Sequence, residues 1–102
     1  MATQIRRSSG NVFRDLGFPH PEAERLLILS HLMMQAAELI KKRRLTQARA
    51  AKLLGVSQPR VSNLMRGKIG LFSIDTLVEM LGRLGVSVTV TTRPTRRRHR
   101  VA

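Results

Sequence analysis

Residues 45–67, LTQARAAKLLGVSQPRVSNLMRG, decide the fold of this chain, because they encode two short helices joined by a tight turn. Thr46 can cap the first helix through its hydroxyl, and good helix formers follow it as far as Gly55. Gly55 can adopt the left-handed conformation that ends a helix, and Ser57 can cap a second helix that runs to about Arg66. Two short helices held at a fixed angle by such a turn are the arrangement with which proteins enter the major groove of DNA.

The apolar residues of this unit fall where two crossed helices need a shared core. Those expected to be buried are Ala50, Leu53 and Leu54 in the first helix, Val56 in the turn, and Val61, Leu64 and Met65 in the second helix. Ala51 lies one helical turn before Gly55, where the helices approach most closely and a larger side chain would separate them. An ordinary helical hairpin, in which the glycine only ends a helix, is the alternative.

A recognisable pattern is formed by small Ala51, the turn glycine Gly55, apolar Val61 and Leu64, and a final Gly67. This pattern resembles the Xre family of helix-turn-helix repressors, which is related to phage Cro and lambda repressor. The resemblance implies a mainly α-helical, lambda-repressor-like domain of about four to five helices. It also implies a transcriptional repressor that binds double-stranded DNA at a specific sequence.

The wider chain, from residue 8 to residue 94, resembles the HigA-like antitoxins within this family. That resemblance implies a protein that represses its own operon and binds a RelE-type ribonuclease toxin, with residues 11–18 and exposed parts of a long helix as toxin contacts. Because such toxins are commonly basic, a toxin would have to meet the charge-neutral residues 1–40. Otherwise the chain is a stand-alone phage-type regulator without a toxin.

The positive charge of the chain is concentrated in two places. The net charge is +13, yet residues 1–40 carry four basic and four acidic side chains. Residues 41–68 carry nine basic and no acidic ones, residues 69–92 sum to −1, and the last ten residues contain five arginines. A run of charge is often only a solvated face, but here it coincides with the helix-turn-helix, so a polyanion is the expected partner.

Composition argues against several other classes of protein. The absence of cysteine excludes disulfides and thiolate zinc sites and fits a reducing cytoplasm, and we expect a bacterial, nucleoid-associated location. No apolar run is long enough for a membrane span, and residues 1–10 lack the apolar core of a signal peptide. The histidines His20, His31 and His99 are scattered and no nucleophile motif is present, so we expect no enzyme, no metal site and no cofactor. A non-specific RNA-binding or ribosome-binding basic protein is the stronger rival.

We expect three regions: residues 1–20 as a partly disordered N-terminal arm, residues 21–92 as the helix-turn-helix domain, and residues 93–102 as a disordered basic tail. A long helix should run from about Pro21 to Arg43, since proline is tolerated in a first turn. Its apolar stripe comprises Leu26, Leu29, Met33, Ala36, Ala37 and Ile40, widened by Leu27, Leu32, Met34 and Leu39. The widened stripe is broader than one small domain needs, so either the additional apolar residues face another chain or the helix is central and fully buried.

The C-terminal third should contain one more helix and one strand. Ser73 can cap a helix over residues 74–84, whose expected buried face comprises Leu77, Val78, Met80, Leu81 and Leu84. Residues 86–92 then alternate valine with hydroxyl side chains, which is typical of a half-buried strand. A lone strand cannot satisfy its own backbone, and residues 11–13 are a short partner. We therefore expect a symmetric homodimer in which this strand pairs with its copy through Val86, Val88 and Val90.

The expected DNA contacts follow from the second helix of the unit. Residues at its N-terminal start point into the groove, which selects Gln58 and Arg60, and Asn63 lies one turn further along. Arginine can pair bidentately with guanine, and glutamine or asparagine with adenine. In the resembling family the positions matching Gln58, Pro59 and Asn63 approach bases, and the one matching Gln47 bonds phosphate. Further phosphate contacts are expected at Ser57, Ser62, Arg66, Lys68, Arg43 and Arg44.

A twofold dimer would constrain the DNA sequence that is bound. The two copies of the second helix would lie about one DNA turn, roughly 34 Å, apart and would select a palindromic operator. Repression follows where that operator overlaps a promoter. For Ser57 and Gln47, helix capping and surface solvation are the alternative roles.

Overall fold

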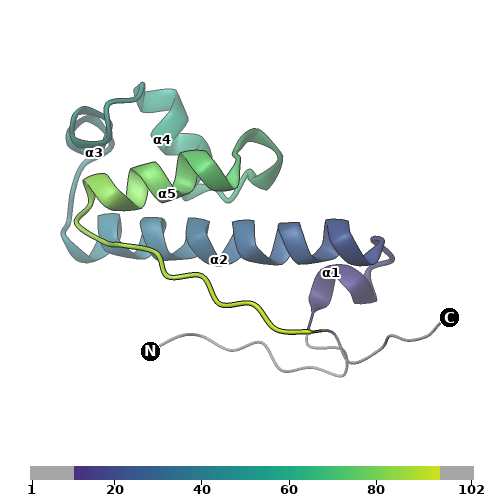
Figure 1. Cartoon of the computed structure of the whole chain (residues 1–102). Helices are drawn as coiled ribbons and strands as arrows, with labels where there is room; N and C mark the ends of the chain where they lie inside the picture. The colour runs from purple at the N-terminus through teal and green to yellow at the C-terminus, as the bar shows by residue number, and fades with distance from the viewer. Residues whose placement is uncertain (1–10, 95–102) are drawn as a thin grey trace, which may run out of the picture.

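The computed structural model describes residues 11–94, which form five α-helices and one 3-10 helix. In order these are α1 (Val12–Asp15), α2 (His20–Lys42), α3 (Gln47–Leu54), α4 (Gln58–Met65), η1 (Ile69–Leu71) and α5 (Ile74–Arg83). In Figure 1, α2 is a long rod with α3, α4 and α5 along one side and α1 beside its N-terminal half. The mainly helical fold expected from the sequence is confirmed.

The long helix α2 begins and ends within one residue of its predicted bounds. Pro19 precedes it, Pro21 lies in its first turn and Glu22 adds negative charge near the positive end of the helix dipole. At its other end Arg44 adopts the left-handed conformation, with φ of 54°. The amide of the next residue, Leu45, donates to the carbonyl of Ile40 at 3.1 Å, which closes the helix and directs the chain into α3.

The turn between α3 and α4 forms as the sequence predicts. The Thr46 hydroxyl accepts a hydrogen bond from the Arg49 amide at 3.1 Å, and Gly55 lies at φ 71° and ψ 32°. The Val56 amide donates to the Ala51 carbonyl at 3.0 Å, which is the closing bond of a glycine-terminated helix. These local bonds therefore fix the two helices as separate elements.

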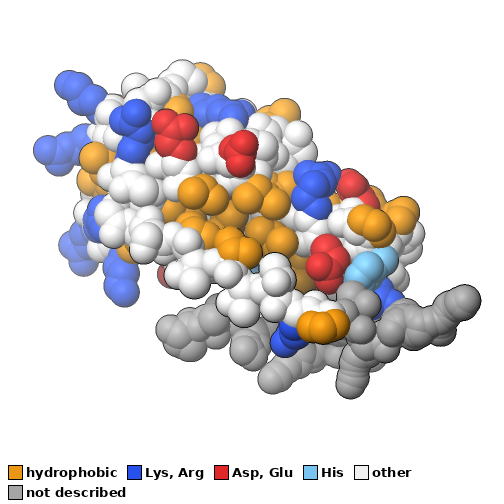
Figure 2. Space-filling view, in the orientation of Figure 1, with side chains coloured by type: hydrophobic (Ala, Val, Ile, Leu, Met, Phe, Trp, Pro, Cys, Tyr) orange, Lys and Arg blue, Asp and Glu red, His pale blue; other side chains and the backbone are white. Residues whose placement is uncertain are grey.

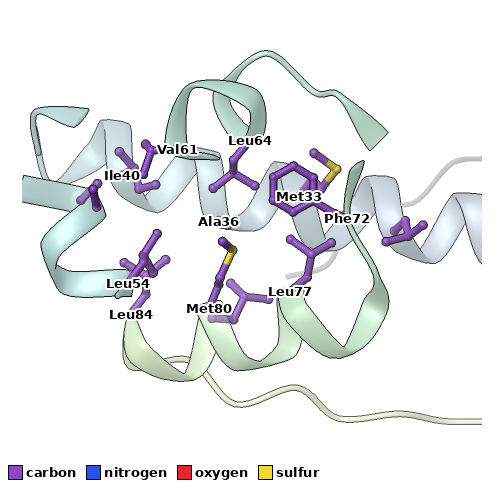
Figure 3. Packing of buried hydrophobic residues seen from close by; sticks show 14 of the residues in the cluster. Met33, Ala36, Ile40, Leu54, Val61, Leu64, Phe72, Leu77, Met80 and Leu84 are labelled. Atoms are coloured by element: carbon purple, nitrogen blue, oxygen red, sulfur yellow. The ribbon is translucent and has the colours of Figure 1, made fainter. Parts of the chain in front are cut away.

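A single apolar cluster holds α2, α3, α4 and α5 together. In Figure 3 the side chains of Met33, Ala36 and Ile40 on α2 face those of α4 and α5. The largest fully buried side chains are Leu29, Ile40, Leu64, Leu77, Leu81, Leu84 and Val61. The outward face of α4 is thereby determined, because burial of Val61 and Leu64 orients the whole helix.

Two apolar residues expected in this core are exposed instead. Leu53 is 41% exposed and Val78 is 39% exposed. Leu53 precedes buried Leu54 and Val78 follows buried Leu77, so each lies about 100° around the helix from a buried leucine. The buried stripe on these short helices is narrower than their apolar composition indicates.

Part of the expected N-terminal arm is packed on α2. Asn11 is buried, and its side-chain carbonyl accepts from the Phe13 amide at 2.9 Å, capping α1. Its side-chain amide donates to the Ala23 carbonyl at 3.1 Å, which attaches α1 to the first turns of α2. Phe13 and Phe18 stack edge to face with ring centroids 6.1 Å apart. Residues 1–10 of the expected arm lie outside the described residues.

The expected strand is not formed within this chain. After α5, residues 86–94 contain no strand and run back past α2 in Figure 1. Val86 and Val88 are partly buried against the core cluster, whereas Val90 is 78% exposed. Residues 11–13, the candidate partner within the chain, cap and begin α1 instead, and pairing with a second copy stays a prediction. The basic tail from residue 95 lies outside the described residues.

Replacing Gly55 with alanine tests the turn. Gly55→Ala places a Cβ in the left-handed conformation, 3.3 Å from an Arg83 nitrogen, and should lower the free energy of unfolding by about 1–2 kcal/mol. Gly82→Ala is the matched control, because Gly82 lies inside α5 with nothing within 4 Å of an added Cβ. That variant should raise stability by about 0.5–1 kcal/mol. Equal effects of the two variants in urea denaturation would contradict the role of the turn.

Candidate nucleic-acid interface

The outward face of α4 presents a short row of polar side chains. Gln58 and Pro59, in its first turn, are exposed, and Ser62 and Asn63 are partly exposed one turn further along. Val61 and Leu64, on the opposite side, are buried in the core. Gln58, Pro59 and Asn63, three of the four predicted base-contact residues, are therefore accessible from one direction.

The N-terminus of α4 is capped without using all the bonding capacity of the cap. The Ser57 hydroxyl accepts from the Arg60 amide at 3.3 Å. A serine hydroxyl also carries one proton that it can donate, and Ser57 is exposed. Ser57 can therefore cap the helix and donate to an anion at the same time.

Arg60, the fourth predicted base-contact residue, points elsewhere. Its Nη1 donates to the Leu71 carbonyl at 2.7 Å. Its guanidinium carbon lies 4.2 Å from the centroid of the Phe72 ring, and Phe72 is buried. In this structure the side chain binds the protein rather than extending along the groove-facing side. The sequence showed Phe72 only as an apolar residue of a loop and gave no sign of this contact.

The two arginines after α2 also differ from each other. Arg43 Nη2 donates to the Leu84 carbonyl at 2.7 Å and so binds the C-terminal end of α5. A cation is favourable there, since the carbonyl end of a helix carries partial negative charge. Both arginines are exposed, so they differ in bonding and not in exposure. Of this predicted pair, Arg43 is the one that binds a backbone carbonyl of the protein.

The polar row on α4 lies in a stretch of the sequence that is rich in basic residues and has no acidic ones. Residues 41–68 contain no acidic side chain. The exposed basic residues of this unit include Lys41, Lys42, Arg44, Arg49, Lys52, Arg66 and Lys68. Figure 2 shows Lys and Arg side chains gathered at the end of the molecule that carries α3, with hydrophobic side chains over the middle. This distribution suits a polyanion at the helix-turn-helix end.

Two of these basic residues were missed in the sequence analysis. Arg49 and Lys52 lie on the side of α3 opposite its buried residues, and both are exposed. Their spacing of three residues, out of phase with the apolar positions Ala50, Ala51 and Leu54, is a signal that could have identified them. Gln47, the remaining predicted phosphate contact, is exposed at the start of α3.

Other kinds of site find no support among the described residues. Residues 11–94 contain no group of three or more His, Cys, Asp or Glu side chains placed to hold a metal ion. Within the same range, no helix combines the length and apolarity required to cross a bilayer.

Comparison with known proteins places the chain in a family. Residues 12–93 match a family model described as "Helix-turn-helix domain". A solved structure described as "Putative XRE Family Transcriptional Regulator" superposes with a TM-score of 0.69 at 34% sequence identity, covering 80% of this chain and 92% of that chain. No curated protein matches the chain. With the turn at Gly55 and the polar outward row of α4, these matches show that the chain belongs to the XRE-type helix-turn-helix family of DNA-binding transcriptional regulators.

Proposed function

We propose that this protein is a repressor that reads the major groove of a palindromic operator through α4. The observation that carries the proposal is the exposed row of Gln58, Pro59 and Asn63 on a helix whose opposite side is fixed in the core. Glutamine and asparagine can each pair bidentately with adenine, and proline can contact a thymine methyl group. A repressor bound in this way blocks transcription where the operator overlaps a promoter.

The proposed phosphate contacts hold α4 in register on the duplex. They comprise Gln47, Ser57, Ser62, Arg44, Arg66 and Lys68, with Arg49 and Lys52 added from their exposure. Contacts of this kind supply affinity and orientation but carry no sequence information. Specificity then rests on the short polar row alone. A non-specific RNA-binding protein would show the same salt-dependent affinity without a preferred duplex.

Replacing Asn63 and Arg66 separately distinguishes the two kinds of contact. Asn63→Ala should lower the preference for one base pair of the operator by about tenfold, because a bidentate contact is lost. Arg66→Ala should weaken binding to operator and random duplex equally and reduce the salt slope by about one. Fluorescence anisotropy on operators selected from random duplexes measures both effects. Identical behaviour of the two variants, or stronger binding to RNA than to any duplex, would contradict the proposal.

We further propose that the repressor is a homodimer that pairs residues 86–92 with the same residues of a second copy. The segment alternates valine and hydroxyl residues and has no strand partner within the described chain. Val78, Val86 and Val88 line a shallow groove of about 400 Å³ between α5 and the segment. Pairing across a twofold axis would cover this groove and supply the missing backbone hydrogen bonds.

A charge at Val90 tests the dimer without disturbing the monomer, because Val90 is 78% exposed. Val90→Lys should shift the protein from dimer to monomer in sedimentation equilibrium, since like charges would meet across the axis. Thr89→Lys, on the other side of the segment, is the control and should remain dimeric. Binding to a full palindrome should fall in Val90→Lys while binding to a half-site is retained. A wild-type protein that is monomeric at micromolar concentration contradicts the dimer.

An antitoxin role is a second proposal, favoured by the surface at the α1 end. Leu16 is 69% exposed, and Val12, Phe18 and Met34 are each more than 40% exposed. Beside them lies an apolar groove of about 380 Å³, lined by Phe13, Ser30, Met33, Met34, Ala37, Leu64, Met65, Gly67 and Ile69. Residues 11–40 carry four acidic and two basic side chains. The net charge of these residues is −2, and an exposed apolar surface on them fits a basic partner protein, such as the RelE-type toxin that the family resemblance implies.

Leu16→Arg tests this surface against a small protein encoded beside this gene. The variant removes apolar contact and adds a like charge, so co-purification with that protein should fall at least tenfold. Operator affinity should be unchanged, because the Leu16 side chain is 69% exposed and does not line the groove shared with α4. Thr89→Lys adds the same charge elsewhere and should leave co-purification intact. If no such neighbouring protein exists, the chain is a stand-alone regulator.

A further inference from the structure

The first turn of α4 is bound to the segment that leads into α5. Within that turn, Arg60 donates to the Leu71 carbonyl at 2.7 Å and stacks over the Phe72 ring at 4.2 Å. Its own amide bonds the Ser57 hydroxyl at 3.3 Å and the Ser57 carbonyl at 3.1 Å. The Arg60 side chain therefore connects the first turn of α4 to Phe72, which is buried between η1 and α5.

The chemistry of this contact is specific to arginine and an aromatic ring. A planar guanidinium can stack on a ring face and still direct an N–H at a carbonyl in its own plane. A lysine ammonium has the same charge but is compact and strongly hydrated, so it cannot make both contacts in this geometry. Phe72 is only 6% exposed, and its ring is held by the core. The buried Phe72 ring therefore positions the Arg60 guanidinium.

A second arginine makes a similar contact elsewhere in the fold. Arg60 bonds the Leu71 carbonyl at the end of η1, and Arg43 bonds the Leu84 carbonyl at the C-terminal end of α5, each at 2.7 Å. The apolar core fixes which side of α4 is outward through buried Val61 and Leu64. The Arg60 contact adds a polar constraint at the first turn of α4, where Gln58 and Pro59 are presented.

We propose that Arg60 is a positioning residue that sets the orientation of α4 for DNA reading and does not itself contact a base. This inference rests on the proposed function, since it concerns how accurately α4 presents Gln58 and Asn63. It replaces the base-contact role that the sequence predicts for Arg60. Phe72 acts through Arg60, so the two residues form one unit.

Arg60→Lys, Phe72→Leu and the double variant test this unit by anisotropy on the selected operator and on random duplex. Arg60→Lys keeps the charge and should lower operator affinity about tenfold, with random-duplex affinity unchanged. Phe72→Leu should cause the same loss, and the double variant no further loss, because either substitution breaks the contact. Arg83→Lys, an exposed arginine of α5 outside the proposed DNA contacts, should leave both affinities and their ratio unchanged.

Several outcomes would overturn the proposal. If Arg60→Lys changes the preferred base at one operator position while Phe72→Leu does not, Arg60 reads a base. If the variants lower the melting temperature but leave the affinity ratio unchanged, the contact only stabilises the fold. Because Arg60 is partly exposed, Arg60→Lys should fold and still test the proposal even if Phe72→Leu fails to fold. If the wild-type protein has no preferred operator, the proposed function itself is wrong. The Arg60–Phe72 contact can be tested separately by NMR without DNA, where the guanidinium protons of Arg60 should be shifted by the ring and should exchange slowly with water.

Discussion

The left-handed turn at Gly55 is the constraint on which the rest of the structure depends. It ends α3 through the Val56 to Ala51 bond and lets Ser57 cap α4 immediately. Because Ala51 is small and buried, the two helices can cross closely enough to share one core with α2 and α5. Without that bend α3 and α4 would continue as one rod, and no polar row would be held outward by buried Val61 and Leu64.

The elements that the sequence predicted are those with local signals. Caps at Thr46, Ser57 and Ser73 each accept the backbone bond expected of them, since a cap acts within its own helical turn. Exposure of Leu53 and Val78 could not be foreseen, because it depends on how wide a stripe the neighbouring helices cover. The strand over residues 86–92 is not formed within one chain, and its pairing in a dimer stays a prediction, because alternation of side chains does not specify the partner.

The same limit applies to charge in the candidate site. Counting basic residues predicts which end of the molecule binds DNA, but counting does not distinguish Arg43 and Arg60, which bind backbone carbonyls, from Arg44 and Arg66. A guanidinium bonded to a neutral carbonyl keeps its full charge, so Arg43 and Arg60 still contribute to the positive field within about 8 Å at physiological salt. In the proposed function, attraction of DNA and direct contact with DNA are therefore carried by overlapping but different sets of residues.

The geometry of α2 relates the two proposed binding surfaces. At about 1.5 Å per residue, a helix of 23 residues separates the α1 end from the start of α3 by roughly 35 Å. The surfaces are nevertheless not independent, since the apolar groove beside α1 is also lined by Leu64, Met65 and Gly67 at the end of α4. A partner that fills this groove contacts the recognition helix from behind. If that contact changes the affinity for the operator, the operator must change the affinity for the partner by the same factor.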